Sequence, residues 1–130
     1  QRHDGRATIN VCDEYDLQDL IHSLLSLYFD DIRPEEWTPS YAGSSSRMDF
    51  LLKLENIVIE LKMTRERLSN KELVDQLAID MFRYSAHPDC KTLVCFVYDP
   101  EERVKNPRGF ERDLSRETGH PCVKVYVVQK

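Results

Sequence analysis

The chain has 130 residues, of which 41% are hydrophobic and 32% are charged, and its formal net charge is −5 at pH 7. This composition excludes an intrinsically disordered chain, which would combine low hydrophobicity with a higher net charge. No apolar run approaches the ~18 residues of a membrane-spanning helix, so we expect no membrane partner. We predict one cytoplasmic domain over residues 1–130. A larger protein that contains this domain stays an open alternative, because residue 1 is Gln rather than Met.

The first predicted element is an amphipathic helix over residues 13–29, which begins with the acidic residues Asp13 and Glu14. Negative charge at this end favours a helix because it opposes the positive end of the helix dipole. A loop over residues 33–46 follows, in which we predict a short strand around Trp37. The apolar side chains of the helix recur at spacings of three and four, which places them on one face. They are Leu17, Leu20, Ile21, Leu24, Leu25 and Tyr28.

Two strands, predicted over residues 47–54 and 57–63, carry the side chains of greatest chemical interest. Side chains alternate along a strand, so Glu60 and Lys62 share one face and Leu61 lies on the other. Leu61 can therefore be buried while its two charged neighbours point together into a site.

A hairpin with Glu55-Asn56 at the centre of its turn would bring Asp49 close to Glu60. An Asp, a Glu and a Lys are the groups needed to hold a divalent metal and a water against a phosphodiester. Carboxylate oxygens suit hard cations such as Mg²⁺, and we expect Mn²⁺ to substitute. The residues therefore predict a metal-dependent nuclease. The plain alternative is that Glu60 and Lys62 are an ordinary solvent-facing pair.

The rest of the chain predicts two helices that alternate with two strands. These elements cover residues 69–85, 92–98, 107–116 and 123–128. On the first helix, Gln76, Asp80 and Tyr84 follow one another at spacings of four along one flank. The first strand is apolar on both faces, as expected of a central strand covered by helices. The order α-β-β-α-β-α-β predicts an α/β fold with a mixed sheet between helices.

Positive charge concentrates near the predicted site although the chain as a whole is acidic. Residues 47–71 carry six basic and four acidic side chains, whereas residues 1–39 carry three basic and nine acidic ones. Phosphate binding needs such a local basic patch. The candidates for nucleic-acid contacts are Arg47, Arg65, Arg67 and Lys71, with Tyr84 as a ring that stacks on a base. A plain solvated surface is the alternative for the basic side chains.

Several blocks of sequence resemble a bacterial domain family that is related to type II restriction enzymes and also occurs appended to defence proteins. The blocks are Arg33-Pro34-Glu35-Glu36-Trp37-Thr38-Pro39-Ser40-Tyr41, Ser46-Arg47-Met48-Asp49-Phe50, and Cys95-Phe96-Val97-Tyr98-Asp99-Pro100 with Asn106-Pro107-Arg108-Gly109. With Asp49 and Glu60-Leu61-Lys62 in the middle strands, residues 14–117 resemble the PD-(D/E)xK nuclease superfamily. This resemblance implies a restriction-endonuclease-like core. One departure is that Met48, rather than Pro, precedes Asp49.

The resemblance also implies a role for each residue that matches the motif. Asp49 and Glu60 would bind the metal, and the backbone carbonyl of Leu61 would add a ligand. Lys62 would orient the attacking water or help to deprotonate it.

Two residues on the helices match further positions of the superfamily. Glu14 matches an acidic residue that some members use as an additional metal ligand; a plain charge at a helix start remains the alternative. Gln76 resembles a position that supports the catalytic site or contacts the backbone of the substrate.

The resulting prediction is a metal-dependent endonuclease that acts on nucleic acid, with DNA as the expected substrate. Restriction or anti-phage defence in the bacterial cytoplasm is its expected setting, with a homodimer or a fused sensor domain as further partners. The alternative function is a non-catalytic nucleic-acid-binding or scaffolding module on the same fold. The intact set of Asp49, Glu60 and Lys62 argues against that alternative, because a domain without activity has no chemical need for all three.

Overall fold

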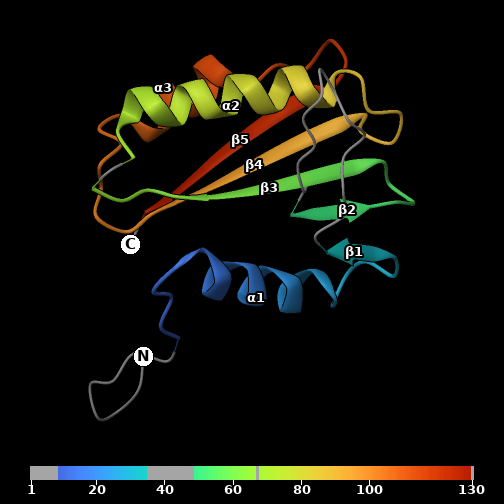
Figure 1. Ribbon diagram of the computed structural model, residues 1–130, viewed down its shortest axis with the longest axis horizontal. Helices are drawn as coiled ribbons and strands as arrows, with labels where there is room; N and C mark the ends of the chain where they lie inside the picture. The colour runs from blue at the N-terminus through green and yellow to red at the C-terminus, as the bar shows by residue number, and fades with distance from the viewer. Residues whose placement is uncertain (1–8, 35–48, 67, 130) are drawn as a thin grey trace.

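A five-stranded mixed sheet with helices on both faces gives the chain an α/β fold (Figure 1). The computed structural model describes residues 9–34, 49–66 and 68–129. In chain order the elements are α1 (Glu14–Leu25), β1 (Ile32–Pro34), β2 (Phe50–Leu52), β3 (Ile57–Met63), α2 (Asn70–Tyr84), β4 (Thr92–Asp99), α3 (Pro107–Leu114) and β5 (Cys122–Gln129). The strands are ordered β1-β2-β3-β4-β5 across the sheet. The pairs β1–β2 and β2–β3 are antiparallel, and the pairs β3–β4 and β4–β5 are parallel.

Helix α1 begins as predicted but ends earlier. The Asp13 side chain caps it by accepting a hydrogen bond from the Asp16 N–H at 2.9 Å. Its end is at Leu25, because the Tyr28 N–H bonds the Leu25 carbonyl at 2.9 Å, a spacing of three that tightens the chain into a turn. The prediction that Tyr28 belongs to the apolar face is therefore wrong, and its side chain is 81% exposed.

Strand β1 is absent from the sequence prediction. It has three residues, which is too short for an alternating pattern to be visible. It ends at Pro34, whose lack of an N–H is tolerated at the end of a short outer strand. The strand predicted around Trp37 lies outside the described residues, as do residues 47 and 48 of the next predicted strand.

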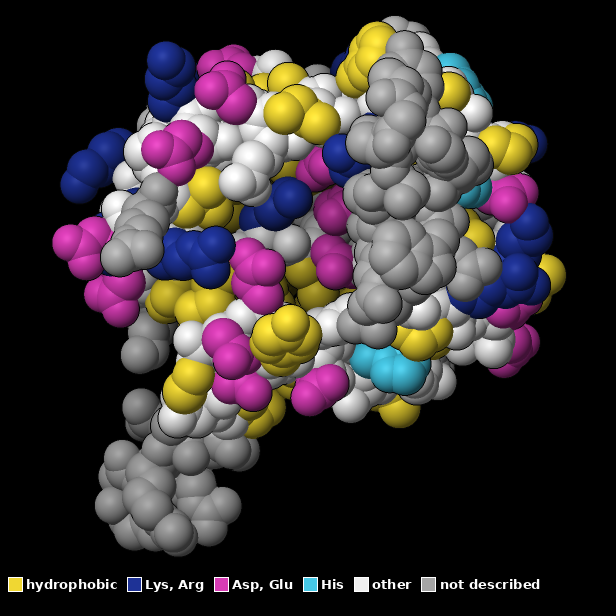
Figure 2. Space-filling view, viewed as in Figure 1, with side chains coloured by type: hydrophobic (Ala, Val, Ile, Leu, Met, Phe, Trp, Pro, Cys, Tyr) yellow, Lys and Arg dark blue, Asp and Glu magenta, His cyan; other side chains and the backbone are white. Residues whose placement is uncertain are grey.

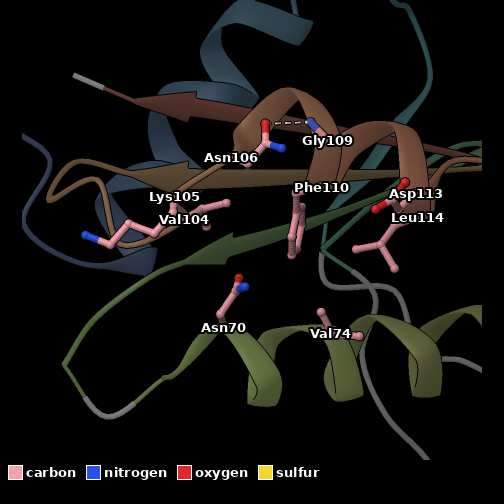
Figure 3. A pocket seen from close by; sticks show the side chains of 9 residues that line it. All are labelled: Asn70, Val74, Val104, Lys105, Asn106, Gly109, Phe110, Asp113 and Leu114. Carbon is pink, nitrogen blue, oxygen red and sulfur yellow. Dashed lines mark hydrogen bonds between the residues drawn. The ribbon is translucent and has the colours of Figure 1, made fainter.

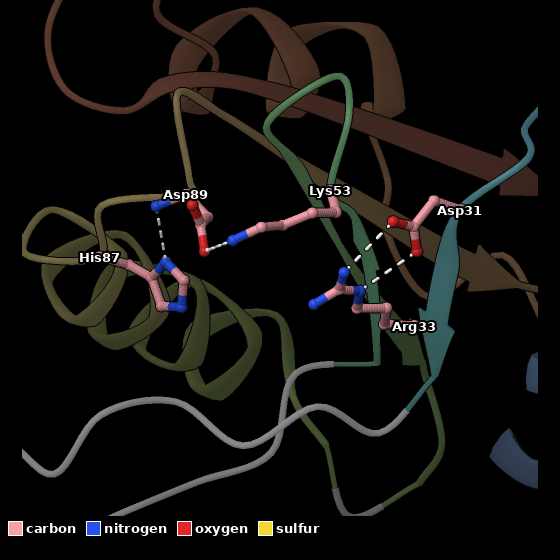
Figure 4. Close-up of polar contacts among 5 residues, drawn as sticks. All are labelled: Asp31, Arg33, Lys53, His87 and Asp89. Atoms are coloured by element: carbon pink, nitrogen blue, oxygen red, sulfur yellow. Dashed lines mark hydrogen bonds and ion pairs between the residues drawn. The ribbon is translucent and has the colours of Figure 1, made fainter.

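The predicted hairpin of β2 and β3 is confirmed, with Leu52 opposite Ile57. Residues 53–56 make the turn, so its centre lies one residue earlier than predicted, and Asn56 takes the left-handed conformation with φ 60°. The Lys53 ammonium contacts the Asp89 carboxylate at 2.5 Å, which ties this turn to the turn between α2 and β4 (Figure 4).

Helix α2 begins as predicted and ends within one residue of the predicted position. The Ser69 hydroxyl caps it by accepting a hydrogen bond from the Glu72 N–H at 3.2 Å. Leu73 and Leu77 are fully buried against the sheet. In the described part of the chain, no helix is long and apolar enough to cross a membrane.

The sheet separates two hydrophobic layers. Under α2 and α3 lies the larger one, in which Leu93 and Val97 of β4 are fully buried. On the α1 side, Leu17 of the helix packs with residues of β2 and β3, and Phe96 of β4 is only partly buried. The prediction that β4 is covered on both faces therefore holds fully for one face, because α1 packs against β3 rather than over β4.

Helix α3 and the residue after it cover the outer edge of β5. The Val127 N–H donates to Oε2 of Glu111 at 2.7 Å, and its carbonyl accepts from Nη2 of Arg108 at 3.2 Å. The Val125 N–H donates to the Ser115 hydroxyl at 3.0 Å. Side chains thus satisfy main-chain groups that an edge strand normally leaves open.

Asp99 ties the ends of β3, β4 and β5 together and is fully buried. Its Oδ1 accepts from the Thr64 hydroxyl at 2.5 Å and from the Arg103 N–H at 2.9 Å. Its Oδ2 accepts from the Val104 N–H at 2.8 Å and from Nε2 of Gln129 at 3.0 Å. Burial alone would raise the pKa of Asp99, but these four hydrogen bonds together lower it.

Asp99→Ala should therefore destabilise the fold strongly. The substitution leaves several buried donors without an acceptor, and we expect the free energy of unfolding to fall by about 3 kcal/mol or more. Urea denaturation measures this change, with Glu101→Ala in the adjacent exposed turn as the control. A loss no larger than that of the control would contradict the structural role assigned to Asp99.

Candidate active site

The predicted site residues lie where β3 extends beyond β2. Because β2 pairs with residues 57–59, residues 60–63 have β4 on one side and no strand partner among the described residues on the other. Asp49 directly precedes β2, and its Oδ2 accepts a hydrogen bond from the Leu61 N–H at 2.7 Å. The N–H and C=O of one strand residue point to the same edge, so the Leu61 carbonyl also faces this open edge.

Glu60 lies on the other side of the strand from the Leu61 side chain, beneath α2, and is 6% exposed. Its Oε1 accepts a hydrogen bond from the Tyr84 hydroxyl. Figure 2 shows acidic and basic side chains gathered in a hollow between α1 and α2, over the middle of the sheet. The strand phase predicted from the alternation of charged and apolar residues is therefore confirmed.

The carboxyl groups of Glu60 and Asp49 both have raised pKa values. Burial, followed by the charges of Asp49 and Asp80, raises the pKa of Glu60 to about 8. Burial also raises the pKa of Asp49, against the opposing effect of the hydrogen bond from Leu61. Adjacent carboxylates in a partly desolvated site repel each other, and a nearby cation relieves that repulsion.

Lys62 lies among carboxylates and pairs directly with one of them. Its ammonium is 3.2 Å from Oδ2 of Asp80 on α2, and Oδ1 of Asp80 is 3.3 Å from Arg83. Burial would lower the pKa of Lys62, but Asp80, Glu60 and Asp49 together raise it. Lys62 is therefore a cation at neutral pH.

The residues at this edge fit a small divalent cation. The Asp49 and Glu60 carboxylates and the Leu61 carbonyl are all oxygen donors, which Mg²⁺ prefers. In residues 9–34, 49–66 and 68–129, no three His, Cys, Asp or Glu side chains form a metal-binding group.

Four other predicted site residues are exposed: Glu14, Arg65, Lys71 and Gln76. Glu14, in the first turn of α1, is exposed, and its charge is one of the influences that raise the pKa of Asp49. Gln76 lies one turn before Asp80 on α2 and is exposed. The candidates for phosphate contacts divide into Arg65 and Lys71, which are exposed, and Arg47 and Arg67, which lie outside the described residues.

Tyr84 and Asp80 have roles that differ from the sequence prediction. The prediction that Tyr84 stacks on a nucleic-acid base is wrong, because its ring is fully buried and its hydroxyl bonds Glu60. The sequence pattern places Asp80 on one flank of the helix with Gln76 and Tyr84 and gives it no separate role. A signal for it exists in the sequence, because Asp80 continues the buried spacing of Leu73 and Leu77, where a carboxylate needs a cationic partner.

A separate pocket of about 440 Å³ opens between α2 and α3 (Figure 3). Its lining combines apolar and polar side chains from the two helices and the loop after β4. These are Asn70, Val74, Val104, Lys105, Asn106, Gly109, Phe110, Asp113 and Leu114. None of the carboxylates at the open edge of β3 is among them.

A mixed sheet between helices, with Asp49, Glu60 and Lys62 near its β2–β3 hairpin, is the architecture of the restriction-endonuclease-like class. The chain matches the family model described as REase_DpnII-MboI over residues 1–130, and it belongs to this family of type II restriction endonucleases. The comparisons with curated proteins and with solved structures give no match.

Membership of this family confirms the predicted function at the level of its class. The chain is a nuclease, and its substrate class is DNA. Its setting is restriction or defence. The alternative of a non-catalytic module finds no support in the family.

In the absence of metal, Glu60→Gln should stabilise the protein at high pH. The folded state raises the pKa of Glu60 to about 8, so the stability linked to its proton is present in acid and lost as the pH rises through that value. We expect the free energy of unfolding of Glu60→Gln to exceed that of the wild type by about 1–3 kcal/mol near pH 9, and to match it near pH 5.

Urea denaturation in EDTA at the two pH values measures this difference, with Glu55→Gln in the exposed hairpin turn as the control. The same difference at both pH values would show that Glu60 titrates normally in the folded protein.

Proposed function

We propose that the chain hydrolyses DNA phosphodiesters with Mg²⁺ held by Asp49, Glu60 and the Leu61 carbonyl, and that Lys62 acts on the attacking water. The observation that carries this proposal is the hydrogen bond of 2.7 Å from the Leu61 N–H to Asp49. It supports the proposal because it holds the Asp49 carboxylate against Leu61, the residue that follows Glu60 on β3.

The metal, when bound, stabilises negative charge on the phosphate and lowers the pKa of a water. The Leu61 N–H fixes one oxygen of Asp49, and the Tyr84 hydroxyl fixes one oxygen of Glu60. Each of these two hydrogen bonds uses one carboxylate oxygen. The repulsion between the two carboxyl groups supports a cation at this position.

Lys62 serves as a donor in this proposal. Its ammonium is 3.2 Å from the Asp80 carboxylate, which supports a protonated side chain that orients a water or stabilises charge on a phosphate oxygen. Of the two roles that the superfamily resemblance implies for Lys62, orientation of the water is therefore the one we propose.

Several outer residues complete the proposed site. Gln76, Arg65 and Lys71 are exposed near the start of α2, where they would contact the DNA backbone. One such site cuts one strand, so we propose that cleavage of both strands uses a second copy of the chain. A fused sensor domain is the alternative partner. Incoming DNA in the cytoplasm would be the target.

Loss of Lys62 or Asp49 should abolish metal-dependent cleavage. We expect Lys62→Ala and Asp49→Asn to lower the rate of plasmid nicking by on the order of 10²–10³-fold, because Lys62 would stabilise charge in the transition state and Asp49 would hold the metal that does so. Asp49→Asn retains an acceptor for the Leu61 N–H, so its fold should be preserved. Cleavage of supercoiled plasmid with Mg²⁺, Mn²⁺ or EDTA measures the effect.

The matched control is Lys124→Ala, whose side chain is exposed on β5. Nicking by Lys62→Ala at the rate of this control would refute the assignment of the site.

Glu14 is proposed as a further ligand, direct or through a water. Glu14→Gln should then weaken Mn²⁺ binding by about 10-fold in a calorimetric titration, because it removes one negative charge next to the cation. Asp19→Asn, on an exposed position of α1, is the control. Identical titrations for the two variants would remove Glu14 from the site and leave the other ligands unaffected.

A further inference from the structure

Helix α2 contacts the open edge of β3 through two polar side chains that lie one turn apart. The Tyr84 hydroxyl donates to Oε1 of Glu60. Oδ2 of Asp80 lies 3.2 Å from the Lys62 ammonium. The two contacts therefore reach the two charged residues of the strand separately.

The spacings of helix and strand match at these contacts. Four residues of an α-helix span about 6 Å along its axis. Two residues of a strand span about 6.6 Å. The order of the contacts is reversed between the elements, with Asp80 against Lys62 and Tyr84 against Glu60, as expected when a helix runs back along the strand that precedes it.

Burial makes each contact costly to lose. Tyr84 is fully buried and Asp80 is 5% exposed. Among the described residues, Oδ2 of Asp80 accepts no hydrogen bond of standard geometry. It forms an ion pair with the Lys62 ammonium. A buried carboxylate without its cation is strongly destabilising.

The hydrophobic core does not require either polar group. Leu73 and Leu77 form the buried stripe of α2, and a leucine at position 80 would extend it without a buried charge. The Asp80 carboxylate and the Tyr84 hydroxyl therefore contact β3, while the Tyr84 ring packs in the core. Arg83 holds the second oxygen of Asp80 at 3.3 Å, which restricts the carboxylate from both sides.

We propose that Tyr84 and Asp80 are positioning residues with separate tasks: Tyr84 orients Glu60 for the metal, and Asp80 fixes Lys62 for its action on the attacking water. This inference rests on the proposed function of Asp49, Glu60 and Lys62. It makes α2 a template that sets the distance between a metal ligand and a catalytic cation.

The test compares Tyr84→Phe and Asp80→Asn in the full chain, because both variants keep most of the side-chain volume. Tyr84→Phe removes the hydrogen bond to Glu60, and Asp80→Asn removes the ion pairs with Lys62 and Arg83. We expect Tyr84→Phe to weaken Mn²⁺ binding by about 10–100-fold in calorimetry, the usual effect of losing a partner of a metal ligand. We expect Asp80→Asn to leave the Mn²⁺ affinity within about 3-fold and to lower kcat by at least about 10-fold at unchanged KM for DNA.

The matched controls are Tyr126→Phe, on the exposed face of β5, and Asp75→Asn, on an exposed position of α2. Both should retain the wild-type Mn²⁺ affinity and kcat. Thermal unfolding of all four variants separates folding from positioning. If Tyr84 and Asp80 had only a structural role, both variants would have a lower Tm, but the loss of Mn²⁺ affinity would not be confined to Tyr84→Phe nor the loss of kcat to Asp80→Asn.

Wild-type Mn²⁺ affinity in Tyr84→Phe, or wild-type kcat in Asp80→Asn, would overturn the division of tasks while leaving the proposed site in place. A wild-type chain that binds no Mn²⁺, or that cleaves as well after Lys62→Ala, would overturn the proposed function and this inference with it. The two failures are therefore distinguishable in one set of measurements.

Discussion

The difference in length between β2 and β3 is the constraint on which the site depends. β2 has three residues and β3 has seven, so the peptide N–H of Leu61 lies beyond the end of its neighbour. The Asp49 carboxylate takes the position that a strand carbonyl would otherwise occupy. One substitution of a side chain for a main-chain acceptor thus fixes the acidic group where the described β2–β3 ladder ends.

Electrostatic balance explains why the same groups form both a stable fold and a reactive site. Burial, followed by the charges of Asp49 and Asp80, raises the pKa of Glu60, while Lys62 and Arg83 both pair with Asp80. In the proposed function, a divalent cation beside Asp49 and Glu60 would relieve the repulsion between these two carboxyl groups.

Much of this arrangement follows from local patterns. Alternation placed Glu60 and Lys62 on one face, and capping residues located the starts of α1 and α2, because both signals depend on neighbours in the chain. β1 and the roles of Asp80 and Tyr84 could not be predicted in the same way. Each depends on a contact between distant residues: β1 on its pairing with β2, and the two side chains of α2 on the register of a helix against a strand.

The covered edge of β5 has a consequence for how copies of this chain can associate. Glu111, Ser115 and Arg108 occupy the main-chain groups of Val125 and Val127 that a foreign strand would need. Strand exchange or fibril-like growth along that side would first require α3 to detach, with loss of its buried Phe110. The side-chain hydrogen bonds therefore prevent another strand from pairing with β5. Self-association at that edge has to proceed through side-chain surfaces rather than through backbone pairing.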